Sequence, residues 1–330
     1  MLKPSTHSLL NSSKNLLAFS AGGDSTALFF LLLKHKIPFD IAIVDYGIRV
    51  QSKEEIAYAL ELAHDYHVEC FVHSAKPITN NFEANARKIR YDFFESLIKK
   101  HNYNNLLTAH HLGDRFEWML MQFCKGAGCV ELSGMQEHEK RKNYHLVRPL
   151  LHLDKSELLK YLHDNQLKYF EDESNRDEKY QRNYFRHHHS QPLLDKHLEG
   201  IKKSFAYLDE DVNDLLHDIS LQRIKDFAYF KNSQHQRSNI FAIDKYLKQE
   251  GYLLSENDRK SLKNSDTVLI SRQIVINQRE DYIFIAPYMI IESMPKKFKE
   301  KMRILKLEPK LRAYIYKDKE VEKFLTSLLS

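Results

Sequence analysis

Short apolar runs alternate with longer helical patterns through the first half of the chain, and this alternation restricts the possible folds strongly. The apolar runs have the length of buried strands and span residues 15–19, 39–46, 69–75 and 104–111. Helical patterns lie between them, over residues 26–36, 52–66 and 82–100. Strands joined by helices form a parallel sheet with helices on both faces. The sequence therefore predicts an α/β, Rossmann-like fold, in which ligands bind beyond the carboxyl ends of the strands.

The loop SAGGDS, residues 20–25, follows the first predicted strand and precedes the first predicted helix. Glycine accounts for 9 of the 330 residues, so the adjacent Gly22 and Gly23 need a reason. Glycine lets backbone N–H groups approach an anion closely, and the start of the next helix directs positive potential at the same point. Ser20 and Ser25 add hydroxyl donors. The loop predicts a phosphate site, although it has neither the lysine of G-x-x-x-x-G-K-S/T nor the spacing of G-x-G-x-x-G.

The same loop resembles the SGGxDS signature of the PP-loop ATP pyrophosphatases, in which it holds the pyrophosphate of ATP while the α-phosphate is attacked. Ala21 replaces the first glycine of that signature. This is a small departure if the φ angle of Ala21 is negative. A turn without any ligand is the alternative. The resemblance implies a PP-loop type of fold and an ATP site made by Ser20, Ala21, Gly22, Gly23, Asp24 and Ser25.

Five further segments, in order, are similar to one branch of that family, the tRNA(Ile)-lysidine synthetases, and the similarity covers about residues 14 to 195. DYGIR, at 45–49, resembles the family's HGLR turn, with Tyr46 at the histidine. The segment AHHLGDRFEW, at 109–118, resembles AHHxDDQxET and departs from it at Gly113, Arg115 and Trp118.

The other three segments match through scattered positions. The E-x-x-AR-x-x-RY helix is matched at Glu83, Ala86, Arg87, Arg90 and Tyr91. RPLL is matched from Arg148 to Leu151. The DxSN…RNxxR segment is matched at Asp172, Ser174, Asn175, Asp177, Arg182, Asn183 and Arg186.

The resemblance implies a reaction of ATP, free L-lysine and the wobble cytidine in the CAU anticodon of an isoleucine tRNA. The O2 atom of cytosine attacks the α-phosphorus and releases pyrophosphate. The ε-amine of lysine then attacks carbon 2 and displaces AMP, which leaves lysidine. Departure of pyrophosphate needs preorganised N–H donors and a divalent cation, so Mg²⁺ is expected with ATP.

Carboxylates are needed to hold the two ammonium groups of lysine. Asp114 and Glu117 lie three residues apart on one predicted helix face, and we expect them to hold lysine together with His110. Acids that merely favour a helix N-terminus are the alternative. Asp45 and Arg49, at the end of the second strand, are expected to contact the nucleotide, although Asp45 could simply cap a turn.

Several cationic or polar side chains are candidates for RNA contacts, or alternatively brace the fold: Arg87, Arg90, Arg148, Arg182, Asn183 and Arg186. The run RHHH, at 186–189, looks like a metal site. Consecutive histidines on a helix point in different directions, however, and no Cys or His partners stand at zinc spacing. We therefore favour contact with the RNA backbone there and predict no side-chain metal cluster.

The basic surplus of the chain is C-terminal. Residues 216–330 contain 22 Lys or Arg against 15 Asp or Glu, although the whole chain has a net charge of only +5. The segment 296–312 is the densest, and such a patch can attract a polyanion or can simply be a solvated helix face. We predict a catalytic domain at 1–190, a helical linker at 191–215 and a smaller, tRNA-binding α+β domain at 216–330. Within the last, residues 266–288 alternate as a β-hairpin would.

Two predicted helix starts have capping-box spacing, at Ser52 with Glu55 and at Asp154 with Glu157. Three irregularly spaced cysteines suit a reducing cytoplasm, and neither a signal peptide nor a membrane span is expected. The alternatives are a thiolase or amide synthetase of the PP-loop type, or an RNA-binding module without turnover. The C-x4-C spacing of Cys124 and Cys129 disfavours a thiolase. Oligomeric state stays open, a homodimer included.

Overall fold

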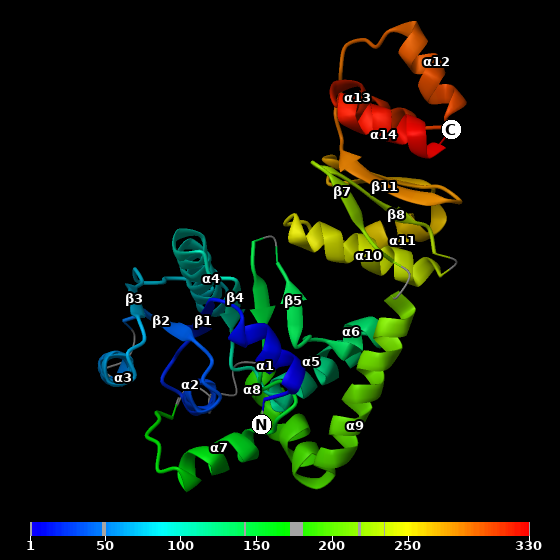
Figure 1. Ribbon diagram of the computed structural model, residues 1–330. Coiled ribbons are helices and arrows are strands. Elements are labelled where there is room, and N and C mark those ends of the chain that lie inside the picture. The colour runs from blue at the N-terminus through cyan, green and yellow to red at the C-terminus, as the bar shows by residue number, and fades with distance from the viewer. Residues whose placement is uncertain are drawn as a thin grey trace. The chain divides into compact units, whose positions relative to one another are not determined.

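The computed structural model describes residues 2–47, 51–141, 143–171, 181–216, 219–233 and 235–329 (Figure 1). The chain divides into two compact units, Met1–Glu210 and Asp211–Ser330. No helix in the described ranges has the length and apolar character needed to cross a membrane.

A six-stranded sheet forms the centre of the N-terminal unit, in the order β3-β2-β1-β4-β6-β5. Its strands are β1 (Asn15–Ala18), β2 (Phe39–Asp45), β3 (Cys70–Ser74), β4 (Asn105–Leu107), β5 (His138–Lys140) and β6 (His145–Val147). Neighbouring strands are parallel except β5 and β6, which pair antiparallel. The predicted α/β fold is confirmed, and the antiparallel edge strand is an addition that the sequence pattern did not reveal.

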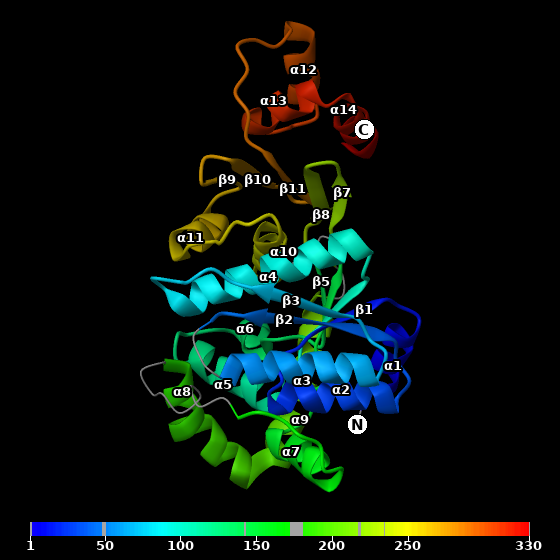
Figure 2. The same cartoon turned by 90° about the vertical axis from the view of Figure 1, so that its left-hand side faces the viewer.

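Helices cover both faces of this sheet. Figure 2 shows α4 (Phe82–His101) on one side of β1–β3, with α2 (Gly23–Lys34) and α3 (Gln51–Asp65) on the other. Successive residues of a strand point to opposite faces. Accordingly Leu16 packs with Phe94 of α4, whereas Leu17 packs with Phe29 of α2. Burial on both faces explains why the strands read as continuous apolar runs.

The remaining helices of this unit lie near the ends of the strands. They are α1 (Pro4–Asn11), α5 (Leu112–Phe123), α6 (Cys129–Ser133), α7 (Lys155–Asp164), α8 (Gln181–Phe185), the π-helical turn η2 (Arg186–Ser190) and α9 (Gln191–Leu216). The predicted linker 191–215 is thus a helix, but Leu194 and Phe205 of α9 pack with Leu112 and Phe116 of α5. Most of α9 therefore belongs to the N-terminal unit.

Only one of the two predicted capping boxes exists. Helix α7 begins with it: Ser156 N–H donates to Asp154 Oδ1 (2.9 Å), and Asp154 N–H donates to Glu157 Oε2 (2.7 Å). Helix α3 already includes Gln51, so Ser52 lies inside the helix and the predicted box there is wrong.

The C-terminal unit is a five-stranded antiparallel sheet in the order β7-β8-β11-β10-β9. Its strands are β7 (Gln222–Ile224), β8 (Phe227–Lys231), β9 (Thr267–Ile270), β10 (Ile274–Gln278) and β11 (Tyr282–Pro287). The α+β prediction is confirmed. The predicted hairpin over 266–288 is extended to a three-stranded meander, because β9, β10 and β11 all lie within it.

Two groups of helices cover this second sheet. Helices α10 (Gln236–Gln249) and α11 (Glu256–Asn264) pack on the face that carries Ile274 and Ile276 of β10. Helices α12 (Lys296–Ile304), α13 (Pro309–Lys317) and α14 (Lys319–Leu329) pack on the face that carries Val275. The basic segment forms α12 and the start of α13, with Phe298 and Met302 buried and most of its lysines in solvent.

We predict that Asp154→Ala lowers the free energy of unfolding by about 1 kcal/mol, because it leaves N–H groups at the start of α7 without an acceptor. Asp154→Ser, which keeps a capping oxygen, should lose much less. Denaturant unfolding of the three proteins measures the difference. Equal destabilisation by Ala and Ser would show that the cap contributes nothing.

Candidate active site

The phosphate loop lies between β1 and α2, at the carboxyl edge of the sheet. Its two serines hold it together: Ser20 N–H donates to Ser25 Oγ (3.3 Å), and the two hydroxyl oxygens are 3.1 Å apart. Gly22 is the N-cap of α2, in extended conformation. A Cβ on Gly23 would lie 3.2 Å from Leu159 of α7, a tight contact that glycine avoids. The loop thus lies at a helix start, where N–H groups without a partner inside the helix can bind an anion.

Ala21 does not meet the condition under which its departure from the signature is small. Its φ angle is +56°, in the left-handed region that favours glycine. The strand-like contact of the loop with Phe170, whose N–H donates to Ala21 O (2.9 Å), accompanies this conformation. A left-handed alanine costs about 1 kcal/mol. Its methyl group is fully buried in the main core, and this burial offsets part of the cost.

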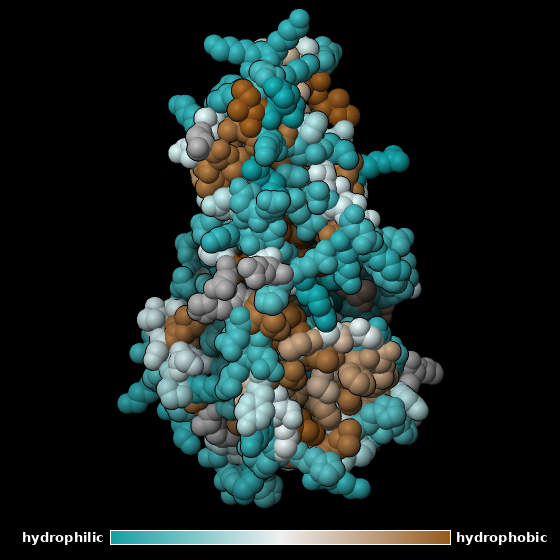
Figure 3. Space-filling view, turned by 90° about the vertical axis from the view of Figure 1, so that its right-hand side faces the viewer, coloured by the Kyte–Doolittle hydropathy of each residue, from teal (hydrophilic) through white to brown (hydrophobic). Residues whose placement is uncertain are grey.

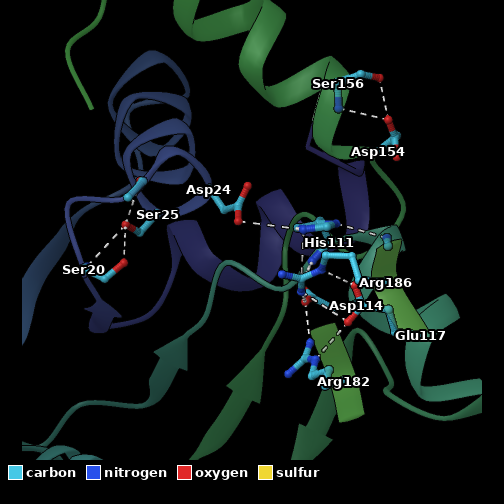
Figure 4. Close-up of polar contacts among 12 residues, drawn as sticks. Ser20, Asp24, Ser25, His111, Asp114, Glu117, Asp154, Ser156, Arg182 and Arg186 are labelled. Carbon is cyan, nitrogen blue, oxygen red and sulfur yellow. Dashed lines mark hydrogen bonds and ion pairs between the residues drawn. The ribbon is translucent and has the colours of Figure 1, made fainter. Parts of the chain in front are cut away.

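Asp24, in the first turn of α2, faces His111 at the start of α5 (Figure 4). Asp24 Oδ2 lies 3.8 Å from His111 Nε2, and Asp24 Oδ1 is buried without a hydrogen-bond partner among the described residues. Gly113 N–H donates to His111 Nδ1 (3.0 Å), which leaves the ring proton on Nε2, directed between Asp24 and Asp114. A Cβ on residue 113 would lie 2.7 Å from the ring, so this arrangement requires glycine there.

Asp114 and Glu117 come together with Arg182 and Arg186 (Figure 4). Arg182 donates to Asp114 Oδ1 (2.5 Å) and to Glu117 Oε2 (2.9 Å). Arg186 donates to both oxygens of Glu117 and lies 3.5 Å from Asp114 Oδ1. The Glu117 side chain is only 2% exposed. The two acids expected at the lysine site thus have guanidinium partners, and the two arginines expected at RNA supply them.

Burial and neighbouring charges shift the pKa values of Asp114 and His110. Burial would raise the pKa of Asp114, but the neighbouring His111 imidazole and the Arg182 guanidinium hold it well below its usual range. Burial lowers the pKa of His110 to about 4, against the opposing effect of Asp114. His110 is therefore neutral at pH 7, and its Nδ1 lies 2.9 Å from Thr108 Oγ1. A neutral imidazole adds no positive charge that would repel an incoming cation.

Other predicted residues lie in varied surroundings. Asp45 Oδ1 accepts a hydrogen bond from Gly47 N–H (2.8 Å) at the end of β2. Arg148 is buried and donates to Gln136 O (2.7 Å) and Glu139 Oε2 (3.0 Å).

Arg87 and Arg90 are exposed on α4, with Arg87 over the ring of Tyr91, and Asn183 is buried. Arg49, Asp172, Ser174, Asn175 and Asp177 lie outside the described residues. For the run 186–189, no set of three or more His, Cys, Asp or Glu side chains in the described ranges is arranged to hold a metal ion.

Sequence reasoning missed a second ion pair beside the site, in which the arginine is buried and the carboxylate is partly exposed. Arg115, 5% exposed, forms a two-pronged pair with Asp209 of α9 and also donates to Ser133 O (2.9 Å) at the end of α6. Its guanidinium carbon lies 4.3 Å from the centre of the Phe205 ring. Arg115 therefore ties α5 to α6 and α9. The partner is 94 residues away, so no local pattern could have identified it.

Comparison with known proteins shows the family of the chain. A family model described as a PP-loop domain matches residues 2–193. A tRNA(Ile)-lysidine synthase from Wolinella succinogenes is 45% identical over 308 residues, covering 93% of this chain and 94% of that protein. The chain belongs to the tRNA(Ile)-lysidine synthase family of PP-loop proteins.

Two more relatives of the same name extend the match. One from Helicobacter pylori (strain ATCC 700392 / 26695) is 44% identical over 93% of this chain and 90% of its own length. One from Campylobacter jejuni (strain RM1221) is 42% identical over 96% of this chain and 97% of its own. Among solved structures, the U34-tRNA thiolase NcsA from Methanococcus maripaludis has a TM-score of 0.52 at 19% identity, covering 62% of this chain and 73% of that one. That likeness concerns the fold alone.

We predict that Asp209→Ala lowers the free energy of unfolding by about 1–2 kcal/mol, because it removes the partly exposed carboxylate that pairs with the buried Arg115 cation. Asp211→Ala, at an exposed position on the same helix, is the matched control and should change stability by less than about 0.5 kcal/mol. Thermal unfolding followed by circular dichroism compares the two. If both variants unfold like the wild type, the pair does not stabilise the packing of α5.

Proposed function

We propose that this chain joins lysine to carbon 2 of the wobble cytidine of isoleucine tRNA bearing a CAU anticodon, at the expense of ATP, and so forms lysidine, AMP and pyrophosphate. The observation that carries the proposal is that the phosphate loop and the acid cluster lie close together at one edge of the sheet. Asp24 of the phosphate loop lies 3.8 Å from His111, whose backbone N–H in turn donates to Asp114 of the acid cluster (3.0 Å). A nucleotide and a cationic amino acid bound there would be neighbours. The names of the relatives support the same reaction, and they do not favour the thiolase alternative.

In the first step the loop residues 20–25 would bind the phosphates, and the cytosine O2 would displace pyrophosphate from the α-phosphorus. N–H groups of the loop and the hydroxyl groups of Ser20 and Ser25 would stabilise the charge on the leaving pyrophosphate. Asp24 fits a role in holding Mg²⁺, because its buried Oδ1 has no hydrogen-bond partner in the described part of the chain. Magnesium sites of this kind combine one or two carboxylates with substrate phosphates. The cation would neutralise charge as pyrophosphate leaves.

In the second step the ε-amine of lysine would attack carbon 2 of the adenylated base, and the C2–O2 bond would break to release AMP. Asp114 is the better candidate for binding an ammonium group of lysine. A carboxylate can accept about four hydrogen bonds. Asp114 accepts one from Arg182 and one from its own helix start, whereas Glu117 is enclosed by two guanidinium groups. Neutral His110 would lie nearby and accept a proton or hydrogen bond from lysine.

The C-terminal unit would hold the tRNA through phosphate contacts. Lys296, Lys297 and Lys299 at the start of α12 are exposed cations on a short stretch of helix. Such contacts position a nucleic acid without reading its sequence. Together with Arg87 and Arg90 on α4, they supply the positive potential that RNA binding requires.

Incubation of the protein with ATP, labelled lysine and an isoleucine tRNA transcript with a CAU anticodon tests the function directly. The expected result is label in the RNA together with one AMP and one pyrophosphate released per lysine incorporated. A transcript whose wobble cytidine is replaced by uridine is the control and should remain unlabelled. Intact ATP binding without any incorporation would contradict the proposal.

We predict different defects for the two acids. Asp114→Asn should raise the KM for lysine at least tenfold while adenylation, measured as pyrophosphate release without lysine, continues. Glu117→Gln should mainly lower the melting temperature, since it removes the shared charge partner of two partly buried arginines. Steady-state kinetics and thermal unfolding separate the two defects. An unchanged KM for lysine in Asp114→Asn would contradict the lysine assignment.

We also predict that replacing Lys296, Lys297 and Lys299 by Gln weakens tRNA binding and reduces the slope of log Kd against log salt by up to about 3, one unit for each lost phosphate contact. The KM for ATP should stay within twofold. Replacement of Lys99 and Lys100, exposed at the far end of α4, is the matched control. Equal losses in both variants would exclude a specific role of α12.

A further inference from the structure

Trp118 is the single tryptophan of the sequence, and it is 43% exposed on α5. It follows Glu117 directly, whose side chain is almost fully buried in the acid cluster. Large aromatic side chains contribute most when they are covered, so an indole left in solvent beside a reaction site is available to a ligand. Figure 3 shows that apolar side chains gather on part of the face drawn there.

The indole is held in a defined position. One edge packs against Gly134, which ends α6 and has a φ angle of +66°. A Cβ at that position would lie 2.9 Å from Trp118 Cδ1, so only glycine lets the ring lie this close. The helix that carries Trp118 is itself fixed to α6 and α9 by Arg115. A rigid aromatic surface loses little conformational entropy when a ligand covers it.

An unpaired RNA base has the chemistry that fits this surface. Proteins recognise single-stranded RNA by stacking its bases on exposed aromatic rings, and every base offers a flat face for this. A cytidine that enters the site for reaction must leave its stack, which deprives the neighbouring base of a partner. Trp118 is six positions after Leu112, the first residue of α5, so it lies about 9 Å along the helix. Its indole can replace the stacking partner that the neighbouring base has lost.

We propose that Trp118 is a stacking platform for an unpaired base of the anticodon loop next to the reacting cytidine. This inference rests on the proposed function and adds one positioning residue to it. The lysidine synthetase pattern has threonine at this position, so the contact would be a property of this chain rather than of the pattern. Arg182, 39% exposed beside the cluster, gives the same region a cation near the path of the RNA.

Tryptophan fluorescence tests the contact on the wild-type protein, because the entire signal comes from Trp118. Titration with the anticodon stem-loop of isoleucine tRNA should quench the emission, whereas ATP with lysine should leave it unchanged. A double-stranded RNA of the same length without a loop is the control ligand and should quench much less. An active enzyme whose emission does not respond to the stem-loop would overturn the proposal.

Variants test the energetic contribution. Trp118→Ala should raise the KM for tRNA about 5- to 150-fold, the range expected for loss of one stacked base. The KM values for ATP and lysine should change by less than twofold. Trp118→Phe should recover much of the loss, and Trp118→Thr should resemble Ala.

Tyr66→Ala is the matched control variant, since Tyr66 is 45% exposed and follows the C-terminal end of α3, at the edge of the sheet opposite the site. An unchanged KM for tRNA in Trp118→Ala would overturn the proposal. A changed sedimentation coefficient of Trp118→Ala with an unchanged KM for tRNA would also overturn it, because the indole would then lie in an interface between copies of the chain. Absence of lysine incorporation by the wild type would instead contradict the proposed function itself.

Discussion

Burial of two carboxylates against two guanidinium groups determines how the first turns of α5 are held. An unpaired buried charge costs several kcal/mol, so Asp114, Glu117, Arg182 and Arg186 are stable there only as a group. The four charges join α5 to α8 and η2, which lie more than sixty residues further along the chain. The same contacts fix the carboxylate of Asp114, so the orientation of this group is set before any substrate arrives.

Sheet topology explains why this cluster lies beside the phosphate loop. Strands β1 and β4 are adjacent and parallel, so α2 and α5 begin side by side at the same edge. Both helix starts direct positive potential outward, and Asp24 and Asp114 in their first turns partly balance it. His111 lies between the two acids, with its Nε2 3.8 Å from Asp24 Oδ2 and 3.6 Å from Asp114 Oδ2. The phosphate loop and the acid cluster are thereby separated by about the width of one imidazole ring.

The sequence predicted the parts of this arrangement that depend on local pattern. Strand and helix positions followed from apolar periodicity, and the loop and α5 motifs were placed at strand ends. The sequence could not reveal contacts between distant residues. Arg182 and Arg186 were assigned to RNA because nothing local showed that their partners are acids on α5. The sequence also left the φ angle of Ala21 open, and a contact with the distant Phe170 accompanies its left-handed conformation.

The three departures from the AHHxDDQxET pattern each have a compensating contact. Gly113 leaves the space that the His111 ring occupies. Arg115 can form a two-pronged pair with a carboxylate, which the glutamine of the pattern cannot, and Asp209 supplies that carboxylate. Trp118 needs the room left by Gly134. Each of these three residues, taken alone, is a mismatch with the pattern. The contacts show that each of the three side chains fits its surroundings while Asp114 and Glu117 keep their places on α5.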